Sequence, residues 1–158
     1  MEKNNLVLVV NPGSASRKYA LYVDGRKLAT VHFEFEDGKV VSTVTKDGQK
    51  YHDSYDDADL SAVSKYVLSL LIRHQVIAAD EKISAVGIRV VAPSKRFATD
   101  QLADDSAIAA LENVQLRAPL HVGTVLAEIR HLKESFTDTP VIIISDSAFH
   151  STKPEWAW

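Results

Sequence analysis

The sequence predicts an α/β domain built around a mixed β-sheet. In the first half, short β-rich runs are separated by Asp-Gly turns, a pattern typical of antiparallel hairpins. In the second half, apolar residues recur at helical spacing between two further apolar runs, which predicts β–α crossovers. A length of 158 residues and a hydrophobic fraction of 46% suit one domain with its own core. We therefore expect residues 1–158 to form a single domain whose first strands are antiparallel and whose helices flank the sheet.

The first half is expected to form a meander of strands. Residues 6–10 are an apolar run, and residues 19–23 form a second run after a polar turn. Residues 27–36 alternate apolar and polar side chains, and residues 39–45 follow a further turn. The hairpin turns share one dipeptide and are Asp24-Gly25, Asp37-Gly38 and Asp47-Gly48.

The second half is expected to alternate helices and strands. Apolar side chains over residues 60–71 share one helical stripe behind Asp57 or Asp59, either of which can cap the helix. The other expected elements are a strand at 83–91, helices at 105–114 and 119–133, and a strand at 141–144. Crossovers of this kind place neighbouring strands parallel, so the sheet becomes mixed.

Composition excludes several classes of partner. The formal net charge is -3, so the chain lacks the basic footprint of a nucleic-acid-binding protein. It has no cysteine, which excludes disulfides and thiolate metal sites. The first apolar run is too short for a signal peptide, and no run approaches the roughly 20 residues of a membrane helix. We expect a cytoplasmic domain without nucleic-acid or membrane partners.

The most informative segment is the polar turn Asn11-Pro12-Gly13-Ser14-Ala15-Ser16-Arg17-Lys18 between the first two strands. It offers backbone N–H groups, two serine hydroxyls and an amide at one edge of the sheet, which are groups that hold a phosphate. It is not a P-loop, because the Walker spacing is absent and a strand follows. From the segment alone, a polar hairpin without a ligand is an equal alternative.

Charged residues lie where two later strands end. Arg89 stands in an apolar strand, and its planar fork matches a carboxylate or phosphate, with an ion pair to a neighbouring acid as the alternative. Asp146 follows an apolar strand directly and suits Mg²⁺ bound through water and phosphate, with a turn cap as the alternative. Ligands on such sheets gather at strand ends, so we expect Asn11, Arg89 and Asp146 to converge.

His121 lies at the start of the expected helix 119–133. A neutral imidazole there can donate to an oxyanion, because the helix N-terminus lowers its pKa and adds N–H groups. A structural histidine is the alternative. The other histidines, His32, His52, His74 and His131, lack the mutual spacing of a metal site.

Taken together, these segments resemble the acetokinase (acetate kinase) family. The polar turn is similar to the family signature Asn-x-Gly-Ser-Ser-Ser-x-Lys, and Gly87-Ile88-Arg89-Val90-Val91 to Gly-His-Arg-Val-Val-His-Gly-Gly. Ala118-Pro119-Leu120-His121 resembles Ala-Pro-Leu-His, and Ser145-Asp146-Ser147-Ala148-Phe149-His150 resembles Phe-Asp-Thr-Ala-Phe-His. The resemblance implies a ribonuclease H-like, actin/hexokinase-type fold, in which two related domains close over ATP and the acceptor.

The resemblance also implies an activity and a role for each motif. The family transfers the γ-phosphoryl group of ATP to a short-chain carboxylate, forming acetyl phosphate from acetate, with Mg²⁺. By resemblance, the residues around the phosphoryl group are Asn11, Ser14 and Ser16. Arg89 would hold the acceptor carboxylate, His121 would stabilise the equatorial oxygens, and Asp146 with Asn11 would hold the metal. Alignment and charge neutralisation are what phosphoryl transfer needs.

The sequence departs from the family pattern near these motifs. Ile88 replaces the histidine before Arg89, and Ala92-Pro93-Ser94 replaces His-Gly-Gly, where Pro93 fixes φ. Val122-Gly123 follows His121 in place of the usual Asn-Pro. The Asn-Pro-Gly-Ser start also occurs in butyrate kinases, so the length of the acceptor stays open.

The family's chains are more than twice this length, and their second domain supplies the adenosine pocket and a second catalytic arginine. We therefore expect this chain to correspond to the first domain, without the nucleotide-binding domain, and to be inactive by itself. A second domain or chain would then be its partner. The alternative is a non-catalytic binding or interaction module derived from the same family.

Overall fold

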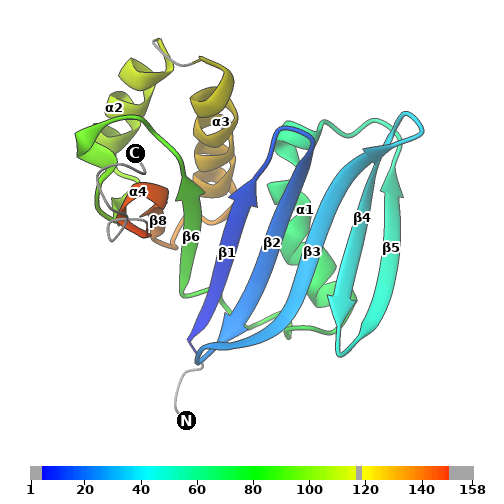
Figure 1. Cartoon of the computed structure of the whole chain (residues 1–158). Helices are drawn as coiled ribbons and strands as arrows, with labels where there is room; N and C mark the ends of the chain where they lie inside the picture. Colours follow the sequence, from blue (N-terminus) through cyan, green and yellow to red (C-terminus); the bar gives the residue numbers. More distant parts are fainter. Residues whose placement is uncertain (1–4, 117–118, 150–158) are drawn as a thin grey trace.

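The computed structural model describes residues 5–116 and 119–149, and it contains an eight-stranded mixed sheet with helices packed against it (Figure 1). The strand order across the sheet is β5-β4-β3-β2-β1-β6-β8-β7. The strands are β1 (Leu6–Pro12), β2 (Ser16–Val23), β3 (Arg26–Glu36), β4 (Lys39–Lys46), β5 (Gln49–Tyr55), β6 (Ala85–Val90), β7 (Gln101–Leu102) and β8 (Val141–Ser145). The helices are η1 (Leu60–Ala62), α1 (Ser64–Arg73), η2 (Lys95–Phe97), α2 (Asp105–Gln115), α3 (Pro119–Ser135) and α4 (Asp146–Phe149).

The antiparallel half of the sheet confirms the predicted meander. Strands β1 to β5 pair antiparallel in chain order. At each Asp-Gly turn the aspartate and the glycine both have positive φ, for example 48° at Asp24 and 79° at Gly25. Two successive residues of positive φ define the type I′ turn, whose twist matches that of the strands. The three dipeptides therefore fix the hairpins.

The parallel half of the sheet aligns the ends of three strands. Strand β1 pairs parallel with β6, with Val10 opposite Ile88, and β6 pairs parallel with β8. The carboxyl ends of these strands consequently meet at one edge of the sheet. Asn11 and Arg89 each follow the Val10–Ile88 pair by one residue, and Asp146 comes directly after β8.

Helices α1 and α3 pack on the same face of the sheet. The side chains of that face alternate along each strand and are buried, as at Leu8 and Val10 of β1 and Phe33 of β3. The phenyl ring of Phe33 packs edge-on against the Tyr19 ring, with centroids 5.8 Å apart. On the opposite face Val9 remains 40% exposed. The core therefore lies between the sheet and these two helices.

One predicted helix is divided in the structure. The stripe over residues 60–71 becomes a 3₁₀ turn, η1, followed by α1. The carboxylate of Asp59 accepts from the Ser61 N–H at 2.8 Å and from the Ser61 hydroxyl at 2.7 Å, so it caps η1 and not α1. The short elements β7, η2 and α4 were not predicted, because two to four residues leave no periodic pattern.

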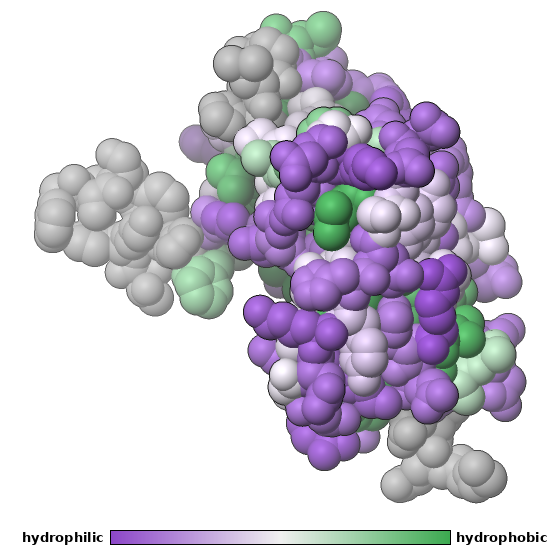
Figure 2. Space-filling view, turned by 90° about the vertical axis from the view of Figure 1, so that its right-hand side faces the viewer, coloured by the Kyte–Doolittle hydropathy of each residue, from purple (hydrophilic) through white to green (hydrophobic). Residues whose placement is uncertain are grey.

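One edge of the sheet is strand β5, whose side chains are mostly exposed and polar. Figure 2 views the molecule from this side and shows mainly hydrophilic side chains with hydrophobic ones scattered between them. Polar edge strands discourage pairing with another chain. Among the described residues, none of the helices combines the length and hydrophobicity needed to cross a membrane.

Strand β5 is tied to the end of α1 by Asp53, which lies 2.7 Å from Nη1 of Arg73 and 3.0 Å from Nε2 of His74. Partial burial acts to raise the pKa of the Asp53 carboxyl. The hydrogen bonds from His74 and Arg73 outweigh burial, so this pKa lies below its ordinary value. A carboxyl group with a lowered pKa stabilises the fold above its unfolded-state pKa, and this stabilisation disappears as the pH falls through the folded-state pKa.

We predict that Asp53→Asn lowers the free energy of unfolding by about 0.5–1 kcal/mol near neutral pH, as expected for a partly exposed ion pair. The deficit should begin to shrink below about pH 4, the ordinary pKa of an aspartate in the unfolded chain, and should disappear only as the pH falls through the lower folded-state pKa. Urea unfolding at neutral and acidic pH measures both values. Asp80→Asn in an exposed loop is the control and should change the free energy of unfolding near neutral pH by less than about 0.5 kcal/mol. A deficit that stays constant with pH would contradict the prediction.

Candidate functional site

The polar turn between β1 and β2 is held by its own backbone. The N–H of Gly13 donates to the carbonyl oxygen of Ser16 at 2.9 Å. A Cβ atom at position 13 would lie only 3.1 Å from that oxygen, so the close approach favours glycine. Ser14 is exposed at the tip of the turn. The sequence therefore produces a tight turn with an accessible hydroxyl group.

Arg89, Asp146 and Asn11 come together from three separate segments. Nε and Nη2 of Arg89 lie 2.8 and 2.7 Å from Oδ1 of Asp146. Nη1 of Arg89 lies 3.5 Å from Oδ1 of Asn11, at the limit of a hydrogen bond. The side chain of Arg89 is 51% exposed and that of Asp146 is 21% exposed. The arginine is thus held in place by a pair that remains open to solvent.

Asp146 is placed by the residue before it. Ser145 is buried, its hydroxyl donates to the carbonyl oxygen of Phe97, and its N–H donates to Oδ1 of Asp100 at 2.8 Å. The same hydroxyl accepts from the N–H of Ala148 at 2.9 Å, which is a capping contact for α4. Ser145 therefore fixes the end of β8 and the start of α4, where Asp146 begins.

A pocket of about 180 Å³ lies beside this cluster. Its lining includes Asn11 and Ser14 from the turn, Arg89 from β6, and Thr124 and Val125 from α3. A cavity of this size suits a small anion such as phosphate or a short carboxylate. A larger hollow of about 600 Å³ lies over β1 to β5 and also reaches Asn11 and Lys18, but its lining includes neither Ser14 nor Arg89 nor Asp146.

The structure places the remaining motif residues differently. Ser16 is the first residue of β2, and its carbonyl oxygen accepts the Gly13 N–H that closes the turn. Ser16 does not line the pocket of about 180 Å³. His121 is the third residue of α3, and its side chain is not among those that the structure describes. The motif residues Ala118 and His150 also lie outside the described residues. The roles of Ser16 and His121 therefore remain predictions.

Sequence reasoning missed Thr124 and Val125 as part of this site. Val125 belongs to the apolar stripe of the helix, which indicates core packing, and Thr124 precedes it without any motif of its own. Both residues reach the pocket because α3 packs against β1 and β6. Only the packing of the helix against the sheet could identify them.

Asp146 and Asn11 supply oxygen atoms of the kind that Mg²⁺ prefers. Both oxygens contact the same arginine, so they lie close together. The described residues contain no cluster of three or more histidine, cysteine or acidic side chains that could enclose a metal ion. One carboxylate and one amide oxygen fit Mg²⁺ held mainly by water and phosphate, and not a closed protein cage.

Comparison with known protein families matches residues 6–158 to the Acetokinase family. The chain belongs to this family. It is 35% identical over 156 residues to an acetate kinase from Streptococcus gordonii and 32% identical over 154 residues to one from Geobacillus kaustophilus. These matches cover 96% and 94% of the chain, but only 39% and 38% of the relatives. The chain therefore spans about two fifths of the length of these kinases.

Solved structures of the family confirm the predicted fold class. An acetate kinase from Porphyromonas gingivalis matches with a TM-score of 0.83 and 28% identity, over 96% of this chain and 40% of that one. A propionate kinase from Francisella tularensis matches with a TM-score of 0.81 and 25% identity, over 96% of this chain and 39% of that one. The chain thus has the ribonuclease H-like, actin/hexokinase-type architecture.

We predict that Arg89→Ala changes the free energy of unfolding by less than about 1 kcal/mol, because half-exposed ion pairs contribute little to stability. The matched substitution is Arg17→Ala. Arg17 is 4% exposed and faces Glu128, so its loss should cost about 3–5 kcal/mol. Urea unfolding of both variants measures the contrast. A cost above about 2 kcal/mol for Arg89→Ala would mean that Arg89 is needed mainly for folding.

Proposed function

We propose that this chain is the phosphate- and acceptor-binding part of an acetate-kinase-type phosphotransferase. The proposed reaction moves the γ-phosphoryl group of ATP to a short-chain carboxylate, with a second domain or chain supplying the nucleotide pocket. The observation that supports it is the meeting of the serine-containing turn with Arg89 and Asp146 beside a pocket of about 180 Å³. The family match over residues 6–158 makes this chemistry the best-supported reading of that pocket.

Each residue of the cluster suits one part of the reaction. The guanidinium of Arg89 can hold a carboxylate by two parallel hydrogen bonds, which orients one oxygen toward the phosphorus. Ser14 and the backbone of the turn can donate to phosphate oxygens. His121, near the start of α3, is proposed to stabilise the charge on the transferring group. A carboxylate acceptor is already a nucleophile, so the cluster needs no general base.

Asp146 and Asn11 are the residues proposed to hold Mg²⁺. When bound, the ion would supply positive charge to the phosphate oxygens. Because Asp146 contacts Arg89, the same carboxylate also fixes the orientation of the guanidinium. The two roles agree, since both place positive charge where the phosphoryl group would pass. The cysteine-free sequence is compatible with the cytoplasmic location proposed for this activity.

A non-catalytic binding module is the second candidate. It is favoured by the replacement of His-Gly-Gly after β6 with Ala92-Pro93-Ser94, where the N–H of Ser94 donates to the carbonyl oxygen of Ala92 at 2.8 Å. This tight turn takes the place of two glycines that would let the backbone approach a substrate. The relatives are named as acetate and propionate kinases, so the length of the acceptor is also left open.

We predict that the purified 158-residue chain forms little or no acetyl phosphate by itself. In the proposed function, the second catalytic arginine of the family comes from the second domain, which the purified chain does not include. The loss of an arginine that stabilises the transferring phosphoryl group lowers the rate about 10³–10⁵-fold in other phosphotransferases. A hydroxamate assay with ATP, Mg²⁺ and acetate measures the product. Turnover near about 10 s⁻¹, an ordinary enzyme value, would show that the chain contains a complete active site.

We further predict that the chain binds inorganic phosphate at the polar turn with a dissociation constant on the order of 1 mM. The side chain of Arg89 is half exposed, so a bound anion would stay in contact with water, which weakens its interactions with the protein. Amide NMR titration should show shifts at residues 11–18, and Arg89→Ala should weaken binding about tenfold because a charged contact is lost.

The control for this titration is Arg130→Ala, which removes an exposed arginine of α3 that pairs with Glu112. Its phosphate affinity should equal that of the wild type. Shifts scattered over surface lysines and unchanged in Arg89→Ala would show that the segment is only a hairpin turn.

A further inference from the structure

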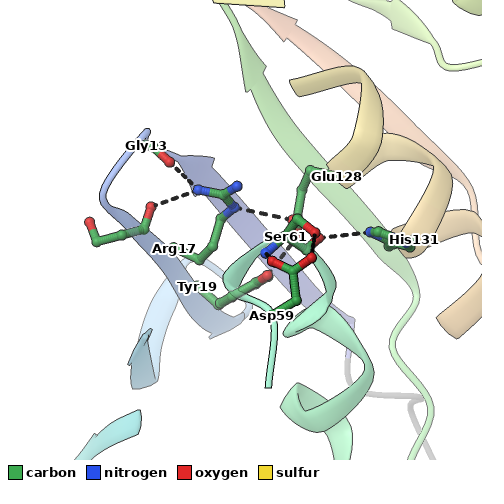
Figure 3. Close-up of polar contacts among 8 residues, drawn as sticks. Gly13, Arg17, Tyr19, Asp59, Ser61, Glu128 and His131 are labelled. Carbon is green, nitrogen blue, oxygen red and sulfur yellow. Dashed lines mark hydrogen bonds and ion pairs between the residues drawn. The ribbon is translucent and has the colours of Figure 1, made fainter. Parts of the chain in front are cut away.

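A buried charged cluster lies behind the polar turn (Figure 3). Arg17 of β2 is 4% exposed and Glu128 of α3 is fully buried. Nε of Arg17 lies 3.5 Å from Oε2 of Glu128, and the hydroxyl of Tyr19 donates to Oε1 of Glu128 at 2.6 Å. The proposed function gives none of these three residues a role.

Arg17 also contacts the turn itself. Its Nη1 donates to the carbonyl oxygen of Gly13 and lies 3.2 Å from that of Ser16. These are the two residues whose backbone hydrogen bond closes the turn. One guanidinium therefore spans both ends of the turn on one side and reaches a helical carboxylate on the other. Carbonyl oxygens repel an anion, and the cation that binds them offsets this repulsion.

Stability does not explain this buried pair. Desolvation of two charges usually cancels their attraction, and apolar residues of similar size are often as stabilising. The geometry is also imperfect, because Nε of Arg17 and Oε2 of Glu128 have no hydrogen-bond partner. Burial raises the pKa of Glu128, against the opposing effects of the Tyr19 hydroxyl and Arg17. A pair that costs this much desolvation needs another reason to be present.

The position of Glu128 on α3 supplies that reason. Thr124 and Val125 line the pocket, and Glu128 lies four and three residues beyond them, on the same side of the helix. The ion pair therefore joins the turn to α3 one helical turn from the pocket wall. If either end moved, the distance between Ser14 and the α3 wall would change with it.

We propose that Arg17 and Glu128 are positioning residues for the anion site, in that their buried pair fixes the shape of the turn and its distance from α3. This inference rests on the proposed function, because it assumes that the turn receives a phosphate group. Neither residue touches the anion. They act by holding the Gly13 and Ser16 carbonyl groups and the pocket wall in one arrangement, as a supporting shell does around a reactive centre.

The test removes both charges together in Arg17→Met/Glu128→Gln. The new amide oxygen can still accept from Tyr19, and replacing a buried pair as a unit is often neutral for stability. We expect the melting temperature to stay within a few degrees of wild type. Amide hydrogen exchange at Gly13, whose N–H is bonded to Ser16, should speed up about tenfold or more, and phosphate affinity in the NMR titration should fall about tenfold.

The matched control is Arg130→Met/Glu112→Gln, which makes the same chemical change in an exposed pair between α2 and α3. It should alter neither Gly13 exchange nor phosphate affinity. If the double variant of the buried pair does not fold, Arg17→Lys replaces it, because lysine keeps the charge but lacks the fork that spans two carbonyl groups. That variant should also speed up Gly13 exchange.

The outcomes separate this inference from the proposed function. Unchanged Gly13 exchange in whichever buried-pair variant folds would overturn the positioning role and leave the pair as part of the core. Faster exchange without a loss of phosphate affinity would also overturn it, because the shape of the turn would then not matter for binding. If the wild type bound no phosphate, the proposed function would fail and this inference would fail with it. Unchanged exchange in a wild type that does bind phosphate would overturn the inference alone.

Discussion

The parallel pairing of β1, β6 and β8 is the constraint on which the rest of this structure depends. It places the carboxyl ends of three strands, spread over more than a hundred residues of sequence, at one edge of the sheet. Asn11, Arg89 and Asp146 meet there because each stands at or just beyond the end of its strand. A shift of one residue in the register of β6 would turn Arg89 to the buried face, and the cluster would be lost.

The two arginines near the turn differ in burial, and this difference suits one of them to binding and the other to holding the structure in place. Arg89 is half exposed, and its pair with Asp146 can exchange partners with an incoming carboxylate or phosphate at little cost. Arg17 is buried against Glu128 and the turn carbonyls, where exchanging partners would leave a charge without solvation. The first arrangement suits a binding residue and the second a fixed one.

The family match and the local geometry support the proposed function through separate observations. The match covers nearly all of the chain, yet the chain spans only 39% of an acetate kinase relative. The pocket beside Ser14 and Arg89 has a volume of about 180 Å³, which is room for a small anion but not for a nucleotide, and the proposed function therefore includes a second wall. Phosphoryl transfer depends on alignment from several sides, so one wall of a site can bind an anion without transferring it.

The sequence by itself determined the hairpins, the main helices and strands, and the polar residues at the strand ends of the candidate site, because each of these depends on local chemistry. Asp-Gly dipeptides set the turns, apolar periodicity set the elements, and polar residues at strand ends marked Asn11, Arg89 and Asp146. Only the tertiary structure decided that Thr124 and Val125 line the pocket and that Arg17 is buried while its neighbour Lys18 is exposed. These properties depend on which helix packs against which strand face, and no local pattern encodes that contact.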